Sequence, residues 1–487
     1  MLFNSLEFIF FFLPISFFIY FHLNKIRLIV AGKIWLVGCS LFFYGWWNIS
    51  YLPLIGISII INYIFGSSIT KNINYTMKKR HLLIIGIIFN IGLLSYYKYA
   101  NFFIHNINTS FDSSLPLLNI VLPLGISFFT FTQTAYLVDC YRGRVKEYDL
   151  LNYTLFVTFY PHLIAGPILH HSEMMPQFAS IKNLLKNNKQ IASGVFLFSI
   201  GLFKKVVIAD TLAVWAVNGF DKAKILNLIE AWVTSLSFTF QLYFDFSGYT
   251  DMAIGAALLF NIKLPVNFNS PYKSMNIQEF WRRWHITLSR FLRDYIYIPL
   301  GGNKSGRFKI YFNLFLTFLL GGIWHGAGWT FIFWGVLHGI AMIMHRIWHN
   351  SGRVMQKNLS WLITFNFINI TWIFFRAKDW DDALKVLKGM VGLSTIVLPE
   401  RLAYVLPDIL ITTFNFTFKS WAENINGSMD TILILFLCFF ITIFCKNSME
   451  MKNKFHPSKY YLMFSISLTL LSLSLLNRIS EFLYFNF

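Results

Sequence analysis

Charged residues are scarce in this chain of 487 residues, and that scarcity decides its class. Asp, Glu, Lys and Arg make up 13% of the side chains, while 56% are hydrophobic and 19% aromatic. Soluble domains carry roughly 25% charged residues, so the composition excludes a soluble globular protein. We expect an all-α polytopic membrane protein with roughly eleven to thirteen transmembrane or re-entrant helices, counted at about 20 residues each.

Acidic residues and cysteines are also few. The 22 acidic residues against 41 basic ones leave a formal net charge of +19. The basic residues lie between apolar segments, which is typical of membrane topology and not of a nucleic-acid partner. The four cysteines are dispersed, and the pair His170-His171 is adjacent instead of one helical turn apart. We therefore predict no metal site and interpret the cysteines as small buried hydrophobes.

Repeats of fixed period and low-complexity linkers are absent too, so we expect one membrane-embedded domain over residues 1–487, in contact with membrane lipids. Basic residues follow the first apolar segment at 25–33 and the third at 71–80, whereas the turn at 48–50 is uncharged. Positive loops stay inside. This pattern predicts a multi-pass protein of the inner (cytoplasmic) membrane, with an extracytoplasmic N-terminus and a first apolar segment that is retained.

Residues 321–329, Gly-Gly-Ile-Trp-His-Gly-Ala-Gly-Trp, are the most informative stretch. They lie in a run, residues 310–345, without Asp, Glu, Lys or Arg. A titratable side chain at membrane depth is costly and marks a substrate path or a proton-handling site. We therefore predict His325 as the functional centre; the alternative is a core histidine bonded to a carbonyl. Residues 122–127 and 160–167 combine Pro with Gly, and we predict broken or re-entrant helices there.

A second polar group occupies residues 276–297. On a helical wheel its aromatic and aliphatic residues share one sector, and its charged residues take the opposite side. This pattern predicts a cytoplasmic amphipathic helix. In one interpretation the arginines hold lipid headgroups and His285 is a satisfied interfacial side chain. In the other, Arg282 and Arg283 gather an anionic donor while His285 faces a catalytic cavity.

Asp245, Tyr249 and Asp251 place two carboxylates and a phenol in an otherwise apolar helix. Asp245 could orient a histidine or an arginine. The alternative is a structural polar cluster that fastens helices together.

Several of these motifs together resemble the membrane-bound O-acyltransferase superfamily, and most of all its bacterial branch for alginate and peptidoglycan O-acetylation. The motifs are residues 160–167, 245–249, 265–272, 280–289, 293–303 and 322–326. The resemblance implies an acyltransferase core over residues 1–377, followed by C-terminal transmembrane helices over 378–487. It also implies a ring of tilted helices around a thin central tunnel.

The resemblance further implies the activity. An acyl group, most simply acetyl, would pass from a cytoplasmic thioester (acetyl-CoA or an acyl carrier) to hydroxyls of an exported polysaccharide such as alginate or peptidoglycan. His325 would be the general base and His285 a second catalytic histidine. The substrate-binding residues would be Arg282, Arg283, Asp245, Trp324 and Tyr249. The glycine-rich turn offers backbone amides for an oxyanion, direct transfer ranks above an acyl-histidine, and an extracytoplasmic esterase-like (SGNH-type) partner is expected.

Two other classes of function compete with an acyltransferase. Broken helices at membrane depth are also a transporter signature, so a transporter or flippase of a lipid- or sugar-linked substrate is one alternative. A non-catalytic assembly subunit of an envelope complex is the other. Movement of substrate without acyl transfer would favour the first, and a silent His325 substitution would favour the second.

Overall fold

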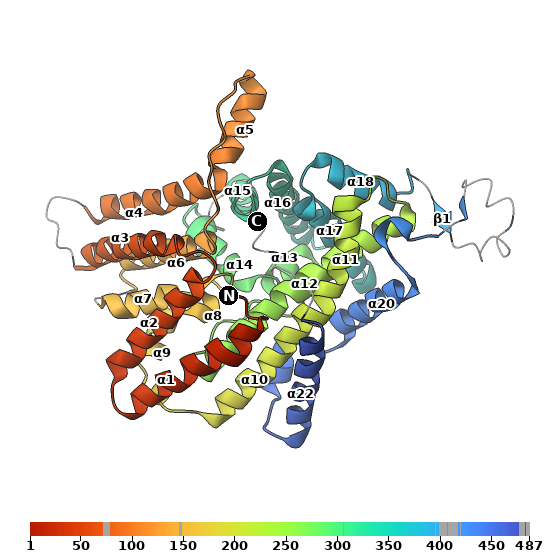
Figure 1. Cartoon of the computed structure of the whole chain (residues 1–487). Helices are drawn as coiled ribbons and strands as arrows, with labels where there is room; N and C mark the ends of the chain where they lie inside the picture. Colours follow the sequence, from red (N-terminus) through yellow and green to blue (C-terminus); the bar gives the residue numbers. More distant parts are fainter. Residues whose placement is uncertain are drawn as a thin grey trace.

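The computed structural model describes residues 1–71, 78–145, 149–304, 306–394, 396–398, 407, 417–418, 420–476 and 483. Within these ranges the regular secondary structure is helical (Figure 1), apart from one parallel pair of two-residue strands, β1 (Val397–Leu398) and β2 (Thr417–Phe418). Six helical stretches are long and apolar enough to cross a membrane: Glu7–Lys25, Tyr51–Lys71, Lys79–Phe111, Asn188–Lys222, Trp329–Asn350 and Lys357–Arg376. The prediction of an all-α polytopic membrane protein is confirmed.

The first half of the chain contains α1 (Leu13–Lys25), α2 (Ile29–Gly45), α3 (Tyr51–Lys71), α4 (Lys79–Leu94), α5 (Ala100–Phe111), α6 (Ile126–Tyr141), α7 (Leu150–Thr158), α8 (Tyr160–Leu163), α9 (His171–Phe178), α10 (Asn188–Phe203) and α11 (Asp210–Val217). The second half contains α12 (Leu228–Leu259), α13 (Ile277–Arg283), α14 (Ile286–Leu292), α15 (Arg307–His325), α16 (Trp329–Asn350), α17 (Lys357–Arg376), α18 (Trp380–Met390), α20 (Met429–Phe444), α21 (Ser448–Asn453) and α22 (Lys459–Ser474). Short π-helical turns continue several of them, among them η2 (Ser95–Tyr99), η4 (Lys204–Ala209) and η7 (Arg293–Tyr297).

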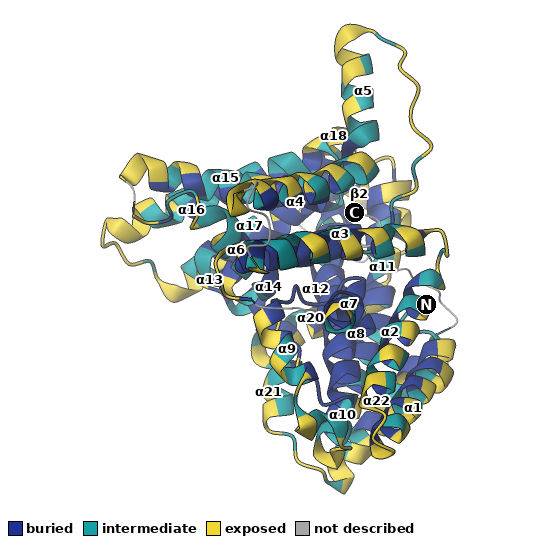
Figure 2. Ribbon diagram, turned by 90° about the vertical axis from the view of Figure 1, so that its left-hand side faces the viewer, coloured by how far each residue is buried: buried dark blue, intermediate teal, exposed yellow. Residues whose placement is uncertain are grey.

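Helix α12 forms the centre of the molecule. Asn227 and Glu230 start it with a reciprocal capping box, and nearly all of its residues are buried, as the dark ribbon in Figure 2 shows. Two lysines of η4 hold it in place. Lys204 lies 2.6 Å from Asp251, and Lys205 lies 2.7 Å from Asp245. These buried ion pairs fasten α12 to the end of α10.

Helices α15 and α16 form a hairpin whose backbones nearly touch. A side chain at Gly322 would place its first carbon 2.6 Å from the Phe331 carbonyl oxygen and 2.9 Å from the Gly335 Cα. Small residues that allow such close approach are how membrane helices gain packing energy. Gly321 and Gly322 lie inside α15, and the break between the two helices falls at residues 326–328. The hairpin therefore places His325 at the very end of α15.

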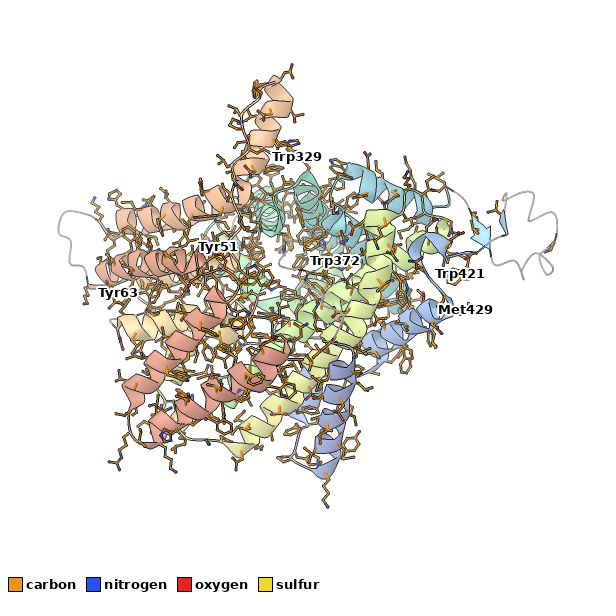
Figure 3. The ribbon with its side chains drawn as sticks, viewed as in Figure 1. Tyr51, Tyr63, Trp329, Trp372, Trp421 and Met429 are labelled. Atoms are coloured by element: carbon orange, nitrogen blue, oxygen red, sulfur yellow. The ribbon has the colours of Figure 1, made fainter. Side chains whose placement is uncertain are left out.

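Helix α5 projects from the body of the molecule in both ribbon views (Figures 1 and 2). It follows α4 and η2 in the chain and turns away from the direction of α4 (Figure 1). Trp329, labelled near the foot of α5 in Figure 3, donates its indole N–H to Asn106 Oδ1 at 2.9 Å. The turn after His325 thus lies on the same side of the molecule as α5.

The predicted helix over residues 276–297 is interrupted. Trp284 is extended and His285 has a left-handed backbone (φ 42°), so α13 ends at Arg283 and α14 begins at Ile286. The predicted division of its sides holds, since Arg282 and Arg293 are exposed while Phe280 and Trp281 are buried. A helical wheel presumes continuous helix, so it could not anticipate the break, which depends on the distant Asn267.

Candidate functional site

His325 is buried among aromatic rings. Its side chain is the last on α15, and its ring centre lies 5.1 Å from those of Trp334 and of Phe375. The ring centre of the preceding residue, Trp324, lies 4.9 Å from that of His325. Three helices, α15, α16 and α17, therefore enclose the imidazole and fix its position.

The carbonyl groups at the end of α15 are capped from outside the helix. The Lys98 ammonium donates to the carbonyl oxygens of Trp324 (2.7 Å) and His325 (2.8 Å). The Tyr99 hydroxyl donates to the Ile323 carbonyl at 2.7 Å. A helix leaves its last carbonyls without intrahelical partners, and in a membrane such groups are expensive. Residues of η2 supply these partners.

Sequence reasoning did not find Lys98. It lies at the end of the apolar segment 82–98, where a lysine is naturally interpreted as the boundary of a span. The signal that could have found it is the position of a cation within a stretch long enough to cross the membrane, Lys79–Phe111.

A pocket opens beside His325. It is small, with a volume of about 40 Å³, and it is lined by Lys98, residues 122–128, Ile164, Trp324 and His325. Its wall is built from the two segments predicted to be broken helices. Gly125 has a left-handed backbone (φ 71°) just before α6, and a side chain there would meet the Leu163 carbonyl at 3.0 Å. Irregular backbone at membrane depth is covered here by protein and lines a cavity.

Asn267 holds His285 in its unusual backbone conformation. Its Oδ1 accepts from the backbone N–H of Thr287 (3.2 Å) and from the Thr287 hydroxyl (2.9 Å), and it lies 3.2 Å from His285 Nδ1. Since a backbone N–H can only donate, the Asn267 atom facing it is the oxygen. His285 Nδ1 then carries the hydrogen, which leaves the lone pair on Nε2.

The two predicted histidines come together around Trp324. The ring centre of His285 lies 6.4 Å from the Trp324 ring, on which His325 also packs. The indole N–H groups of Trp324 and Trp334 are buried without an acceptor among the described residues. Unpaired buried donors are unusual in proteins, so this centre offers hydrogen bonds to a bound group.

An aromatic column leads away from this centre. Trp324 stacks on Phe131 (4.9 Å), Phe131 on Phe291 (4.1 Å), and Phe291 packs on Tyr295 (4.9 Å). Tyr295 ends the column in a polar cluster.

The cluster at the end of the column joins three elements. The Tyr295 hydroxyl donates to Asp139 at 2.8 Å and lies 2.9 Å from His170 Nδ1, and the Arg142 guanidinium lies over the Tyr295 ring. Burial raises the pKa of Tyr295, and the Asp139 carboxylate adds to the effect, so the phenol stays protonated. Sequence reasoning missed this cluster, because its members lie far apart in the chain.

The other predicted site residues have different neighbours. Arg282 is exposed, whereas Arg283 pairs with Glu279 at 2.8 Å. Asp245 binds Lys205 and not a histidine or an arginine, which matches the alternative of a cluster that fastens helices. The buried Tyr249 stacks on Phe3 at 4.8 Å. The structure thus brings His325, His285 and Trp324 together but engages Asp245 and Tyr249 elsewhere.

His338 is a third buried histidine of this region. Its Nδ1 lies 3.2 Å from the Trp281 indole nitrogen, which donates to it, and its ring packs on Trp334 at 4.6 Å. The contact joins α16 to α13.

Comparisons with known proteins agree with this geometry. A sequence model of the membrane-bound O-acyltransferase family matches residues 46–378. The peptidoglycan O-acetyltransferase of Helicobacter pylori is 55% identical over 428 residues, covering 82% of this chain and 81% of the relative. A probable alginate O-acetylase of Pseudomonas aeruginosa is 40% identical over 410 residues, covering 82% and 76%. The teichoic acid D-alanyltransferase of Bacillus subtilis is 27% identical over 283 residues, covering 54% and 71%.

Proposed function

The chain belongs to the membrane-bound O-acyltransferase family, and we propose that it passes an acetyl group from a cytoplasmic thioester to hydroxyls of an exported cell-envelope polysaccharide. The observation that carries the proposal is the pair of histidines around Trp324, of which His325 lines a pocket. The names of the relatives support O-acetylation of peptidoglycan or alginate. The higher identity to the peptidoglycan enzyme favours peptidoglycan as the acceptor.

His325 is the proposed general base. A hydroxyl is a poor nucleophile until its proton is removed, and a neutral imidazole can take that proton. The acceptor oxygen then bonds to the carbonyl carbon of the thioester, and the carbon–sulfur bond breaks. The sulfur leaves with the electron pair and receives the proton from His325, so the products are an ester and a thiol. No acyl-histidine is required.

His285 and Trp324 are the proposed positioning groups for the substrates. The lone pair on His285 Nε2 suits it to accept a hydrogen bond from a second hydroxyl of the acceptor sugar, next to the hydroxyl whose proton His325 removes. The Trp324 indole N–H can donate to the acyl carbonyl oxygen, since it has no acceptor among the described residues. All three residues lie within the proposed acyltransferase core, residues 1–377.

The donor and the acceptor reach this centre from opposite sides in the proposal. The N-terminus and α5 are on the extracytoplasmic side, where an esterase-like partner completes transfer to the polymer. The basic residues around α13 and η7 are on the cytoplasmic side of the inner membrane. The aromatic column from Trp324 to Tyr295 supports this arrangement, because it joins the histidines to that polar side.

Arg282 is the exposed arginine of α13 and the better placed of the two to bind an anionic donor. Replacing it with Gln removes one charge-assisted contact and is expected to raise the KM for acetyl-CoA about tenfold. Arg283→Gln is expected to change the KM less, since the Arg283 side chain is occupied by Glu279 and by the Asn269 carbonyl. Arg80→Gln, at an exposed residue of the predicted cytoplasmic side, is the control. An unchanged KM in Arg282→Gln would identify that side chain as a lipid contact.

Loss of the gene tests the function itself. Cells lacking it are expected to lose the alkali-labile acetyl groups of their cell wall, and a plasmid copy should restore them. The acetate released from isolated sacculi reports acetylation of peptidoglycan, and the acetate released from soluble exopolysaccharide reports acetylation of a polymer such as alginate. Normal acetate in both fractions would refute the proposal.

A further inference from the structure

Lys98 is a half-buried lysine whose partners differ from those of the two buried lysines of η4. Lys204 and Lys205 each bind a buried aspartate. Lys98 lies in the apolar stretch Lys79–Phe111, and in the described part of the chain it binds no carboxylate. A charge at membrane depth is expensive and is retained where it has a task. The neighbours of Lys98 indicate which task that is.

The Lys98 ammonium lies at the negative end of α15. Aligned peptide dipoles place about half a negative charge at a helix C-terminus. Here that terminus is His325 itself, and the pocket beside it is lined by Lys98 as well. In acyl transfer a negative charge develops on the acyl oxygen. Without a cap, the negative end of α15 would repel the charge on the acyl oxygen. The Lys98 ammonium carries a full positive charge next to the two carbonyls, so the net charge at this helix end becomes positive.

Lys98 also fixes the turn that carries His325. Its two hydrogen bonds, at 2.7 and 2.8 Å, hold the last two carbonyls of α15, and the turn at residues 326–328 follows at once. A shift of about 1 Å in a reacting group can cost about 100-fold in rate. The position of the imidazole therefore depends on this contact.

We propose that Lys98 is a positioning residue for acyl transfer, which fixes the end of α15 that bears His325 and offsets the negative charge of that helix end beside the reacting group. The inference rests on the proposed function, since it takes His325 as the base in this pocket.

Three substitutions separate charge from hydrogen bonding at Lys98. Native membrane vesicles from a deletion strain expressing each variant receive radiolabelled acetyl-CoA, and ester-linked label is measured per molecule of protein. Lys98→Met removes both charge and donors, and is expected to lower kcat about 100-fold while the KM for acetyl-CoA changes less than about threefold. Lys98→Arg keeps the charge and should recover most of the rate. Lys98→Gln keeps donors without charge and should recover less than Lys98→Arg.

Two controls accompany these variants. Tyr99→Phe removes the neutral donor to the same helix end, and is expected to change kcat less than about threefold. Lys33→Met removes a partly buried lysine whose ammonium donates to Asn152 at 2.7 Å, away from the pocket. It should leave kcat unchanged.

The outcomes divide clearly. Wild-type kcat in Lys98→Met, or an equal loss in Tyr99→Phe, overturns the positioning role. If Lys98→Met does not accumulate, the comparison of Lys98→Gln with Lys98→Arg decides alone, and equal rates in that pair contradict the role of the charge. Absence of label with the wild-type protein would instead refute the proposed function.

Discussion

Replacing His325 with Ala is expected to lower acetyl transfer about 10²- to 10⁴-fold, the usual contribution of a general base. The imidazole lines the pocket and packs against the rings of Trp324 and Trp334, and we expect no other side chain of α15 to replace it as a base. The measurement is ester-linked acetate on isolated sacculi, normalised to the amount of protein in the membrane.

A second substitution at His325 and a control variant test whether the loss is specific to the base. His325→Gln keeps a polar side chain of similar size and should be as inactive as His325→Ala, because an amide cannot take up a proton at neutral pH. His105→Ala changes an exposed histidine of α5 and should retain full activity. Unchanged acetate in His325→Ala would remove the base from the mechanism and revive the assembly-subunit hypothesis.

Replacing Lys205 with Met is expected to destabilise the protein by about 3–5 kcal/mol, the cost of leaving a buried charge without its partner. The Lys205 ammonium lies 2.9 Å from Asp210 and 2.7 Å from Asp245, and all three side chains are at most 4% exposed. Its loss leaves two carboxylates facing each other in the interior. Thermal unfolding of the purified protein in detergent measures the effect.

Lys378→Met is the matched control. Lys378 pairs with Asp221 at 3.1 Å, but its side chain is 69% exposed. Exposed pairs contribute less than about 1 kcal/mol, so this variant should unfold close to the wild type. Equal melting temperatures for Lys205→Met and Lys378→Met would show that the buried cluster carries no stability. Lys205→Met combined with Asp245→Asn should regain part of the loss.

The sequence predicts the membrane class and the central histidine for a simple physical reason. The run without charged residues, 310–345, can be recognised from the sequence directly, and His325 is a titratable residue within it. The two interrupted segments at 122–127 and 160–167 were likewise visible, because Pro and Gly limit the backbone locally. That these segments meet each other at Gly125 and Leu163 is a property of the fold alone.

Residues that act through distant partners escape such reasoning. Asn267 holds the break at His285 from 18 positions away, and a helical wheel takes no account of it. The sequence left two roles open for Asp245, a partner for a histidine or an arginine and a structural polar cluster. The contact with Lys205 of η4 favours the second role. The local sequence pattern identifies which residues are unusual. The tertiary contacts determine which partners these residues bind.

The cap on α15 has a consequence for biosynthesis. Lys98 and the carbonyls that it binds are separated by 226 and 227 positions in the chain. The helix that carries the ammonium is therefore synthesised and delivered to the membrane long before its acceptors exist. Until the ribosome has passed residue 325, this cation must stay hydrated or at the lipid headgroups. Completion of the pocket is thus a late event of assembly. A chain released before α15 is made contains the lysine but lacks the base and the carbonyls that the lysine caps.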